Sequence, residues 1–141
     1  MNLPLPLMLE EMIGSGLWSS THRSKRLILE EHTATFDLSE TIYLSQPPFH
    51  TVDYYAKGPG KEYWDQHQTI LHGVKPALAL IIAQLGWWSP DIIVLDYRHA
   101  RFNPCVLKLP STEVSISTSS NNWIKIADDF PTFAAKLRFP S

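Results

Sequence analysis

The chain has 141 residues, 44% of them apolar, which suits a single globular domain with a sizeable core. Its 12 lysines and arginines against 14 aspartates and glutamates give a net charge of −2, which argues against a general nucleic-acid-binding protein. No apolar run approaches the ~18 residues of a membrane span, and the first residues lack the basic start of a secretory signal. We therefore expect a cytoplasmic protein that binds neither membrane nor nucleic acid.

The first predicted element is a helix over residues 6–15. The run Gly14-Ser15-Gly16 supplies a stop signal, and Trp18 is expected to pack back onto the helix. Four apolar residues recur at helical spacing and define its inner face: Leu5, Leu9, Met12 and Ile13.

The middle of the chain has weaker patterns. Residues 41–44 fit a short strand or a helical turn, and Gly58-Pro59-Gly60 marks a plain turn. The segment Phe49 to Ala56 is rich in aromatic and β-branched residues, so we interpret it as a strand or an exposed binding segment. Residues 62–72 resemble a helix, with Trp64 on one side.

The strongest pattern is the run from Asp91 to Arg98, which is apolar and β-branched between charged ends. Such a run is typical of a strand that is covered on both faces. We therefore predict that residues 92–95 form a central strand, flanked by segments 78–83 and 105–109. Taken alone, the apolar run 78–82 fits a buried helix or a strand.

The last predicted element is a helix after Asp128-Asp129, with an aspartate as its cap and Pro131 in its first turn. Its apolar face comprises Phe130, Phe133, Ala134 and Leu137. Strands followed by a covering helix predict one α+β domain over residues 1–141. We expect a mixed or antiparallel central sheet with helices packed around it.

Three segments occur together in an order and spacing that are informative. Residues 86–98 contain a glycine, Ser-Pro and Leu-Asp-Tyr-Arg, and Asn103-Pro104 then precedes an apolar strand. The third is a pattern leading into the last helix: Trp123, Ile126, Ala127, Phe130 and Phe133. Over residues 78–139, with a fainter echo at 5–18, the chain resembles the SUKH superfamily, most closely its Smi/Knr-type, glucan-synthesis-regulator-like family. Residues 25–75 lack that family's usual entry segment and receive no assignment from it.

The resemblance implies a SUKH-like fold without a shared catalytic residue or cofactor. Many bacterial members resemble immunity proteins for polymorphic toxins, whereas fungal members are regulatory or scaffold-like. It therefore implies a non-catalytic domain that binds and neutralises a polymorphic or contact-dependent toxin, often a nuclease. The alternative is a regulatory or scaffold protein that binds a host protein. The sequence leaves the oligomeric state open.

No catalytic or metal-binding pattern is complete, so we expect no enzyme, no cofactor and no metal. Asp96, Arg98 and His99 cluster at a strand end. They form either a polar site or a structural feature in which Asp96 caps a neighbouring backbone or pairs with Arg98 or another arginine. The one cysteine, Cys105, is expected to be a small buried apolar residue. The histidines lack metal-ligand spacing: His22, His32, His50, His67, His72 and His99.

Aromatic residues near turns are the best candidates for protein contact. Trp87 and Trp88 are adjacent, so one of them is expected to be exposed, and they are predicted to lie beside the segment from Phe49 to Tyr55. Three nearby aspartates would meet basic groups on a nuclease-like partner: Asp53, Asp65 and Asp91. In the alternative interpretation, both tryptophans are buried at the end of the sheet and contact nothing outside the chain. The predicted contact residues are Trp87, Trp88, Phe49, Tyr54, Tyr55, Asp53 and Asp91.

Overall fold

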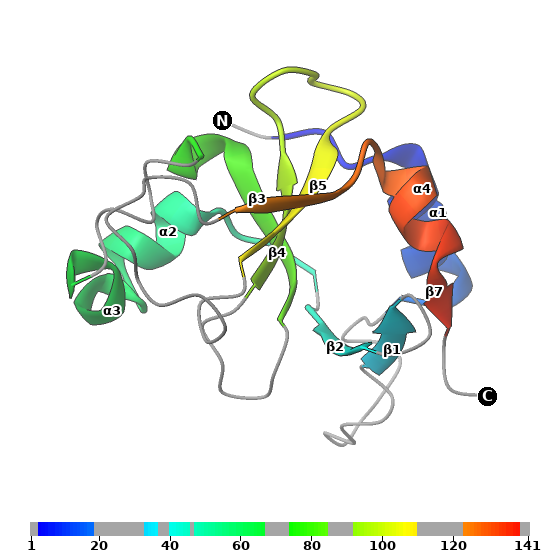
Figure 1. Ribbon diagram of the computed structural model, residues 1–141, viewed down its shortest axis with the longest axis horizontal. Coiled ribbons are helices and arrows are strands. Elements are labelled where there is room, and N and C mark those ends of the chain that lie inside the picture. The colour runs from blue at the N-terminus through cyan, green and yellow to red at the C-terminus, as the bar shows by residue number, and fades with distance from the viewer. Residues whose placement is uncertain are drawn as a thin grey trace.

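A sheet of seven strands runs through the centre of the computed structural model, with helices on both sides of it (Figure 1). The structure describes residues 3–18, 33–36, 40–45, 47–66, 74–84, 92–109 and 123–138. In chain order the elements are α1 (Leu7–Ser15), β1 (Thr33–Phe36), β2 (Glu40–Leu44), α2 (Val52–Lys57), α3 (Lys61–Gln66), a 3-10 helix (Pro76–Leu78), β3 (Ala79–Gln84), β4 (Ile92–Asp96), β5 (Cys105–Leu109), β6 (Ile124–Ala127), α4 (Phe130–Ala135) and β7 (Leu137–Arg138).

The strands lie in the order β6-β5-β4-β3-β2-β1-β7, and each pair of neighbours is antiparallel. The predicted α+β class is confirmed. The sequence analysis expected either a mixed or an antiparallel sheet, and the described strands form an antiparallel one. β4 lies between β3 and β5, as predicted for residues 92–95 and their flanking segments. The apolar run 78–82 is therefore a strand for most of its length.

β4 is buried from end to end because both faces of the sheet are covered. All five of its residues are buried. Ile93 and Leu95 belong to one core, whereas Ile92 and Val94 belong to the other. Side chains alternate between the faces of a strand, so burial on both sides requires the uninterrupted apolar run seen in the sequence.

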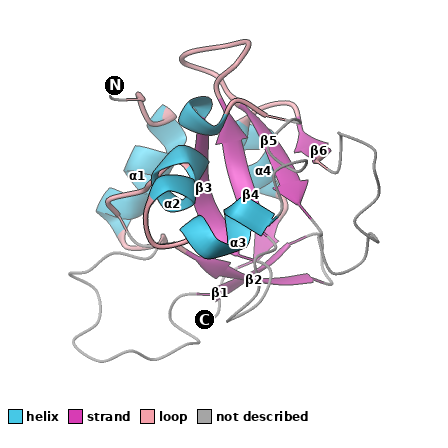
Figure 2. Cartoon of the chain, turned by 90° about the vertical axis from the view of Figure 1, so that its left-hand side faces the viewer, coloured by secondary structure: helices cyan, strands magenta, loops and turns pink. Residues whose placement is uncertain are grey.

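The helices divide between the two faces of the sheet. Leu9 of α1 and Phe130 of α4 belong to one core, and Val52 of α2 and Trp64 of α3 belong to the other. Figure 2 is seen from the side of α2 and α3, which lie in front of the central strands, with α4 behind them. The described chain therefore forms three layers, with the sheet in the middle.

The first helix folds as the sequence predicts. Gly16 ends α1 with a φ of 86°, in the left-handed region that favours glycine. The chain then turns back, since the backbone N–H of Trp18 donates to the Met12 carbonyl at 3.0 Å and the Trp18 ring is fully buried. The predicted inner-face residues are buried or partly buried against the core: Leu5, Leu9, Met12 and Ile13.

The segment from Phe49 to Ala56 is not a strand, so that alternative is wrong. The segment makes one isolated bridge with the sheet, with Thr51 opposite Leu80, and α2 begins at the next residue. The Thr51 hydroxyl accepts a hydrogen bond from the backbone N–H of Tyr54 at 3.1 Å and so caps the helix. This cap and the full burial of Val52 outweigh the strand preference of the aromatic and β-branched residues.

Neighbouring predictions in the middle of the chain agree with the structure where it describes them. Residues 41–44 lie in β2, and residues 58–60 form the turn between α2 and α3. α3 covers the first half of the helix predicted for residues 62–72, and Trp64 is buried there. The second half of that prediction falls outside the described residues.

The last helix is shorter than predicted. Asp129 caps it by accepting a hydrogen bond from the backbone N–H of Thr132 at 2.8 Å, and Pro131 occupies the first turn, both as expected. However, α4 ends before Leu137, which instead lies in β7 opposite Phe36 of β1. Leu137 is buried in either case, so its apolar character could not reveal that the backbone changes from helix to strand.

Replacement of Ile93 with alanine is predicted to lower the free energy of unfolding by about 2–5 kcal/mol, because the side chain is fully buried between layers. Urea denaturation measures this loss. Ile124→Ala on the edge strand β6 is the matched control, because that side chain is 48% exposed. It should cost less than about 1 kcal/mol. Equal losses in the two variants would contradict the central position of β4.

The Asp129 cap is predicted to make stability depend on pH. Hydrogen bonds from Thr132 hold the pKa of the Asp129 carboxyl below its ordinary value of 3.8. Because the folded-state pKa is the lower one, this stabilisation is present above about pH 4 and is lost as the pH falls further. Melting curves should show Asp129→Ala less stable than the wild type at pH 7, with the gap closing in acid. Asp129→Asn, which keeps a capping oxygen, should lose less at pH 7. A gap of constant size down to about pH 2 would argue against the cap.

Candidate functional site

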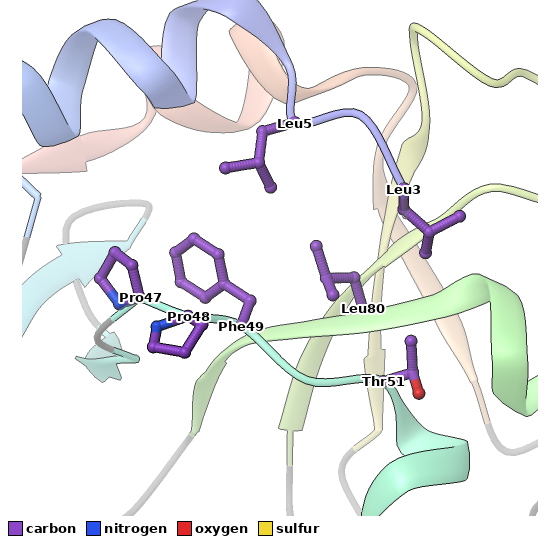
Figure 3. A pocket seen from close by; sticks show the side chains of 7 residues that line it. All are labelled: Leu3, Leu5, Pro47, Pro48, Phe49, Thr51 and Leu80. Carbon is purple, nitrogen blue, oxygen red and sulfur yellow. The ribbon is translucent and has the colours of Figure 1, made fainter. Parts of the chain in front are cut away.

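An open apolar groove of about 310 Å³ lies beside the start of α1 (Figure 3). The Leu5 side chain and the Phe49 ring point toward one another across it, and Leu80 of β3 lies between the two walls. None of the lining side chains is ionisable: Leu3, Leu5, Pro47, Pro48, Phe49, Thr51 and Leu80. The groove therefore suits an apolar group.

Both walls of the groove are tied to the central strands. On one side, the Tyr97 hydroxyl donates to the Pro4 carbonyl at 2.7 Å. Burial raises the pKa of Tyr97, so this hydroxyl keeps its proton across the physiological range. On the other side, the backbone N–H of Ile81 donates to the His50 carbonyl at 2.9 Å. The groove is therefore a preformed feature, which lowers the entropy cost of filling it.

An aromatic ridge of His50, Tyr54 and Tyr55 adjoins the groove through the segment that follows Phe49. The His50 ring stacks on Tyr54, with centroids 4.0 Å apart and planes 13° from parallel. Tyr55 meets Tyr54 edge-on at 5.3 Å, and burial, followed by the charge of Tyr54, raises the pKa of Tyr55. Tyr54 remains 48% exposed. A large aromatic ring that is held in place and open to solvent is typical of a protein-contact residue.

Three of the predicted aromatic contact residues are thus found at one place. Phe49 lines the groove, Tyr54 is exposed on the ridge, and Tyr55 is half-buried against the core under α2 and α3. The predicted neighbours lie outside the described residues, so their position beside this segment stays a prediction: Trp87, Trp88 and Asp91.

The two described aspartates predicted to meet a basic partner are paired within the chain. Asp53 forms an ion pair with Lys57 at 3.2 Å, and Asp65 forms one with Lys61 at 2.6 Å. Each pair joins residues four apart on the solvent side of its helix, where such pairs contribute little to stability. Their charges are largely compensated locally, which weakens the expected attraction to a basic partner.

Most of the groove lining was not predicted from the sequence. Its residues come from the N-terminal segment, from residues 47–51 and from β3, which are far apart in the chain. No periodic pattern connects such segments, although the apolar Pro-Pro-Phe loop is a local signal. The lining residues that were not predicted as site residues are Leu3, Leu5, Pro47, Pro48 and Leu80, whereas Thr51 lies within the predicted contact segment from Phe49 to Tyr55.

Asp96 and Arg98 form the structural pair that the sequence offered as one alternative. Asp96 is 2% exposed and accepts a hydrogen bond from the backbone N–H of Arg98 at 3.1 Å. The Arg98 guanidinium donates two further hydrogen bonds to the Asp96 carboxylate, one from Nε at 3.0 Å and one from Nη2 at 2.8 Å. The pKa of Arg98 is raised, chiefly by these hydrogen bonds. The carboxylate is thereby compensated, as a buried charge requires.

This pair also borders a second depression, the polar cavity, which fits the other alternative of a polar site. Cys105 is half-buried rather than fully buried there, with Sγ 3.8 Å from Asp96 Oδ2. Burial, and then the Asp96 charge, raise the pKa of the Cys105 thiol, so it stays protonated and unreactive. The cavity has a volume of about 310 Å³ and is lined by Asp96, Arg98, His99, Cys105, Leu107, Trp123 and Lys125.

The described histidines occupy separate places. His50 lies in the aromatic ridge, and His99 is exposed at the polar cavity. Within the described ranges, no group of three or more His, Cys, Asp or Glu side chains is placed to hold a metal ion. The remaining histidines fall outside those ranges: His22, His32, His67 and His72.

Three comparisons, with protein-family models, with curated proteins and with solved structures, give no match to this chain. Among the helices that the structure describes, none combines the length and apolar composition needed to cross a membrane. The SUKH resemblance therefore rests on the residues that carry it, and the interpretation of function rests on that resemblance and on surface chemistry.

Proposed function

We propose that this chain is a non-catalytic protein-binding domain of the SUKH type, an immunity protein that binds a nuclease-like toxin domain in the cytoplasm and neutralises it. The observation that carries the binding role is the apolar groove with the aromatic ridge beside it. The resemblance over residues 78–139 supports the more specific role in immunity.

The chemistry of this surface suits a protein partner. Leucine, proline and phenylalanine side chains line the groove, so an apolar partner side chain would leave water there without stranding a charge. Tyr54 stands next to it and offers both an apolar ring and a hydroxyl, the combination enriched at the energetic centre of interfaces. Because hydrogen bonds already hold the Pro4 and His50 carbonyls on the two walls of the groove, binding would not require these segments to fold.

The reactive groups of the described chain are engaged in ways that favour a structural role. Asp96 is compensated by Arg98, and the raised pKa of Cys105 keeps its thiol protonated. A nucleophilic cysteine requires the opposite shift, toward the thiolate. These arrangements support a domain that works through its surface.

Identification of the partner tests the proposed role. The tagged chain is purified from its source organism, and the proteins bound to it are identified by mass spectrometry. We expect a toxin domain whose activity falls when an equimolar amount of the chain is added. Recovery of a host regulatory protein, with no effect on any toxin, would favour the regulatory or scaffold alternative and contradict the immunity role.

Tyr54→Ala is predicted to weaken binding of that toxin domain by about 1–2 kcal/mol in isothermal titration calorimetry, because the variant removes an exposed aromatic contact. Its melting temperature should stay close to that of the wild type, since the ring is half exposed. Tyr54→Phe keeps the ring and serves as the control, with most of the affinity retained. Unchanged binding by Tyr54→Ala would remove the ridge from the interface.

A further inference from the structure

The outer face of α1 presents apolar side chains to solvent as well as to the core. Leu9 and Met12 are buried against the sheet, whereas Leu7 is 71% exposed and Met8 is 40% exposed. A helix that covers a sheet usually keeps its apolar residues on the inner face. A single exposed leucine is nevertheless ordinary in a folded protein, so the meaning of Leu7 depends on its neighbours.

Leu7 continues the apolar wall of the groove. Leu3 and Leu5 line the groove, and α1 begins two residues after Leu5, at its edge (Figure 3). Two residues of extended chain span at most about 7 Å, so Leu7 lies beside the groove. Exposed apolar surface therefore extends from the groove onto the first turn of α1, and a continuous surface of this kind is typical of a site of interaction.

Two carboxylates stand beside Leu7 on the outer face of the helix. Glu10 and Glu11 follow it by three and four residues, the spacings that make side chains neighbours on an α-helix. Both are exposed, and within the described part of the chain neither side chain forms an ion pair or a hydrogen bond. They differ in this from Asp53 and Asp65, which lysines compensate. The negative charge beside the groove is therefore open to a partner.

This combination selects the chemistry of the partner segment. An apolar side chain of the partner would leave water in the groove, and a cation next to it would reach the glutamates. A partner carboxylate would be repelled at the same place, so the surface discriminates by the sign of the charge. Arginine fits better than lysine, since its planar guanidinium can hold a carboxylate through two hydrogen bonds and its stem can cover an exposed leucine.

We propose that the toxin segment that fills the groove presents an apolar side chain followed by an arginine, and that α1 receives this arginine. Its guanidinium pairs with Glu10 and Glu11, and its stem packs on Leu7. The inference rests on the proposed function and deepens it, because it adds the first helix to the interface and names the residue types that the interface recognises.

The test uses the whole ¹⁵N-labelled chain and two capped tetrapeptides, acetyl-Leu-Arg-Leu-Arg-amide and its Leu-Gln-Leu-Gln counterpart. The backbone amides of residues 7–12 report binding by NMR. We expect the arginine peptide to shift them saturably, with a Kd of about a millimolar, and added salt to weaken its binding. The glutamine peptide should bind at least about threefold more weakly.

Variants of the exposed residues separate this site from general effects of charge. The double variant Glu10→Gln, Glu11→Gln should weaken the arginine peptide about threefold to tenfold and leave the glutamine peptide unchanged. Leu7→Ala should weaken both peptides. Glutamine and alanine are good helix formers, so α1 should persist. Glu62→Gln is the matched control and should change nothing, since Glu62 is also exposed and without an ion pair among the described residues, but lies on α3, on the other side of the sheet.

Equal binding of the two peptides, or equal losses in Glu62→Gln and in the double variant, would overturn the proposed contact. Sedimentation equilibrium of the free chain should show a monomer. A dimer that dissociates in Leu7→Ala would mean that a second copy covers this face, and would contradict the proposal. No toxin domain takes part in these measurements, so their failure would leave the immunity role to the test by partner identification.

Discussion

The burial of β4 on both faces is the constraint on which the rest of the structure depends. Ile93 and Leu95 face one core, and Ile92 and Val94 face the other, so neither layer of helices can be removed without exposing this strand to water. The same constraint places β3 and β5 beside it and brings α1 and α4, far apart in the chain, onto one face. The strand thus determines where each surface can carry function.

The residues at the end of β4 serve both candidate surfaces. Asp96 is the last residue of the strand, and with Arg98 it forms a wall of the polar cavity, whereas the Tyr97 hydroxyl holds the N-terminal segment that lines the apolar groove. These are the Asp-Tyr-Arg residues of the SUKH resemblance. Their side chains alternate between the two faces, as consecutive residues of an extended chain do. In this chain Asp96 binds Arg98 and Tyr97 binds the N-terminal segment, so these residues stabilise the fold. They also position the residues that line the groove and the polar cavity.

The sequence predicted the elements whose burial imposes a regular pattern. The run at residues 92–95 is apolar because both sides are covered, and α1 shows its inner face at helical spacing. Prediction failed at Thr51 because a local interaction, the cap of α2, outweighed the aromatic composition of the segment. It also failed at Leu137, which is buried as a strand residue and not as part of the helix. β6 and β7 are too short for a periodic signal. The groove could not be predicted because it exists only when three separate segments meet, although Phe49 and Tyr54 were predicted as contact residues from their chemistry.

The central functional claim is that a partner protein covers the groove and the aromatic ridge. Hydrogen–deuterium exchange of the chain, alone and in complex with the proposed toxin partner, tests this claim most directly. Backbone amides of residues 49–57 lie on or next to both features, and burial under a partner would slow their local opening. We expect slower exchange across this segment in the complex than in the free chain. Unchanged exchange there, with protection confined to other surfaces, would contradict the account.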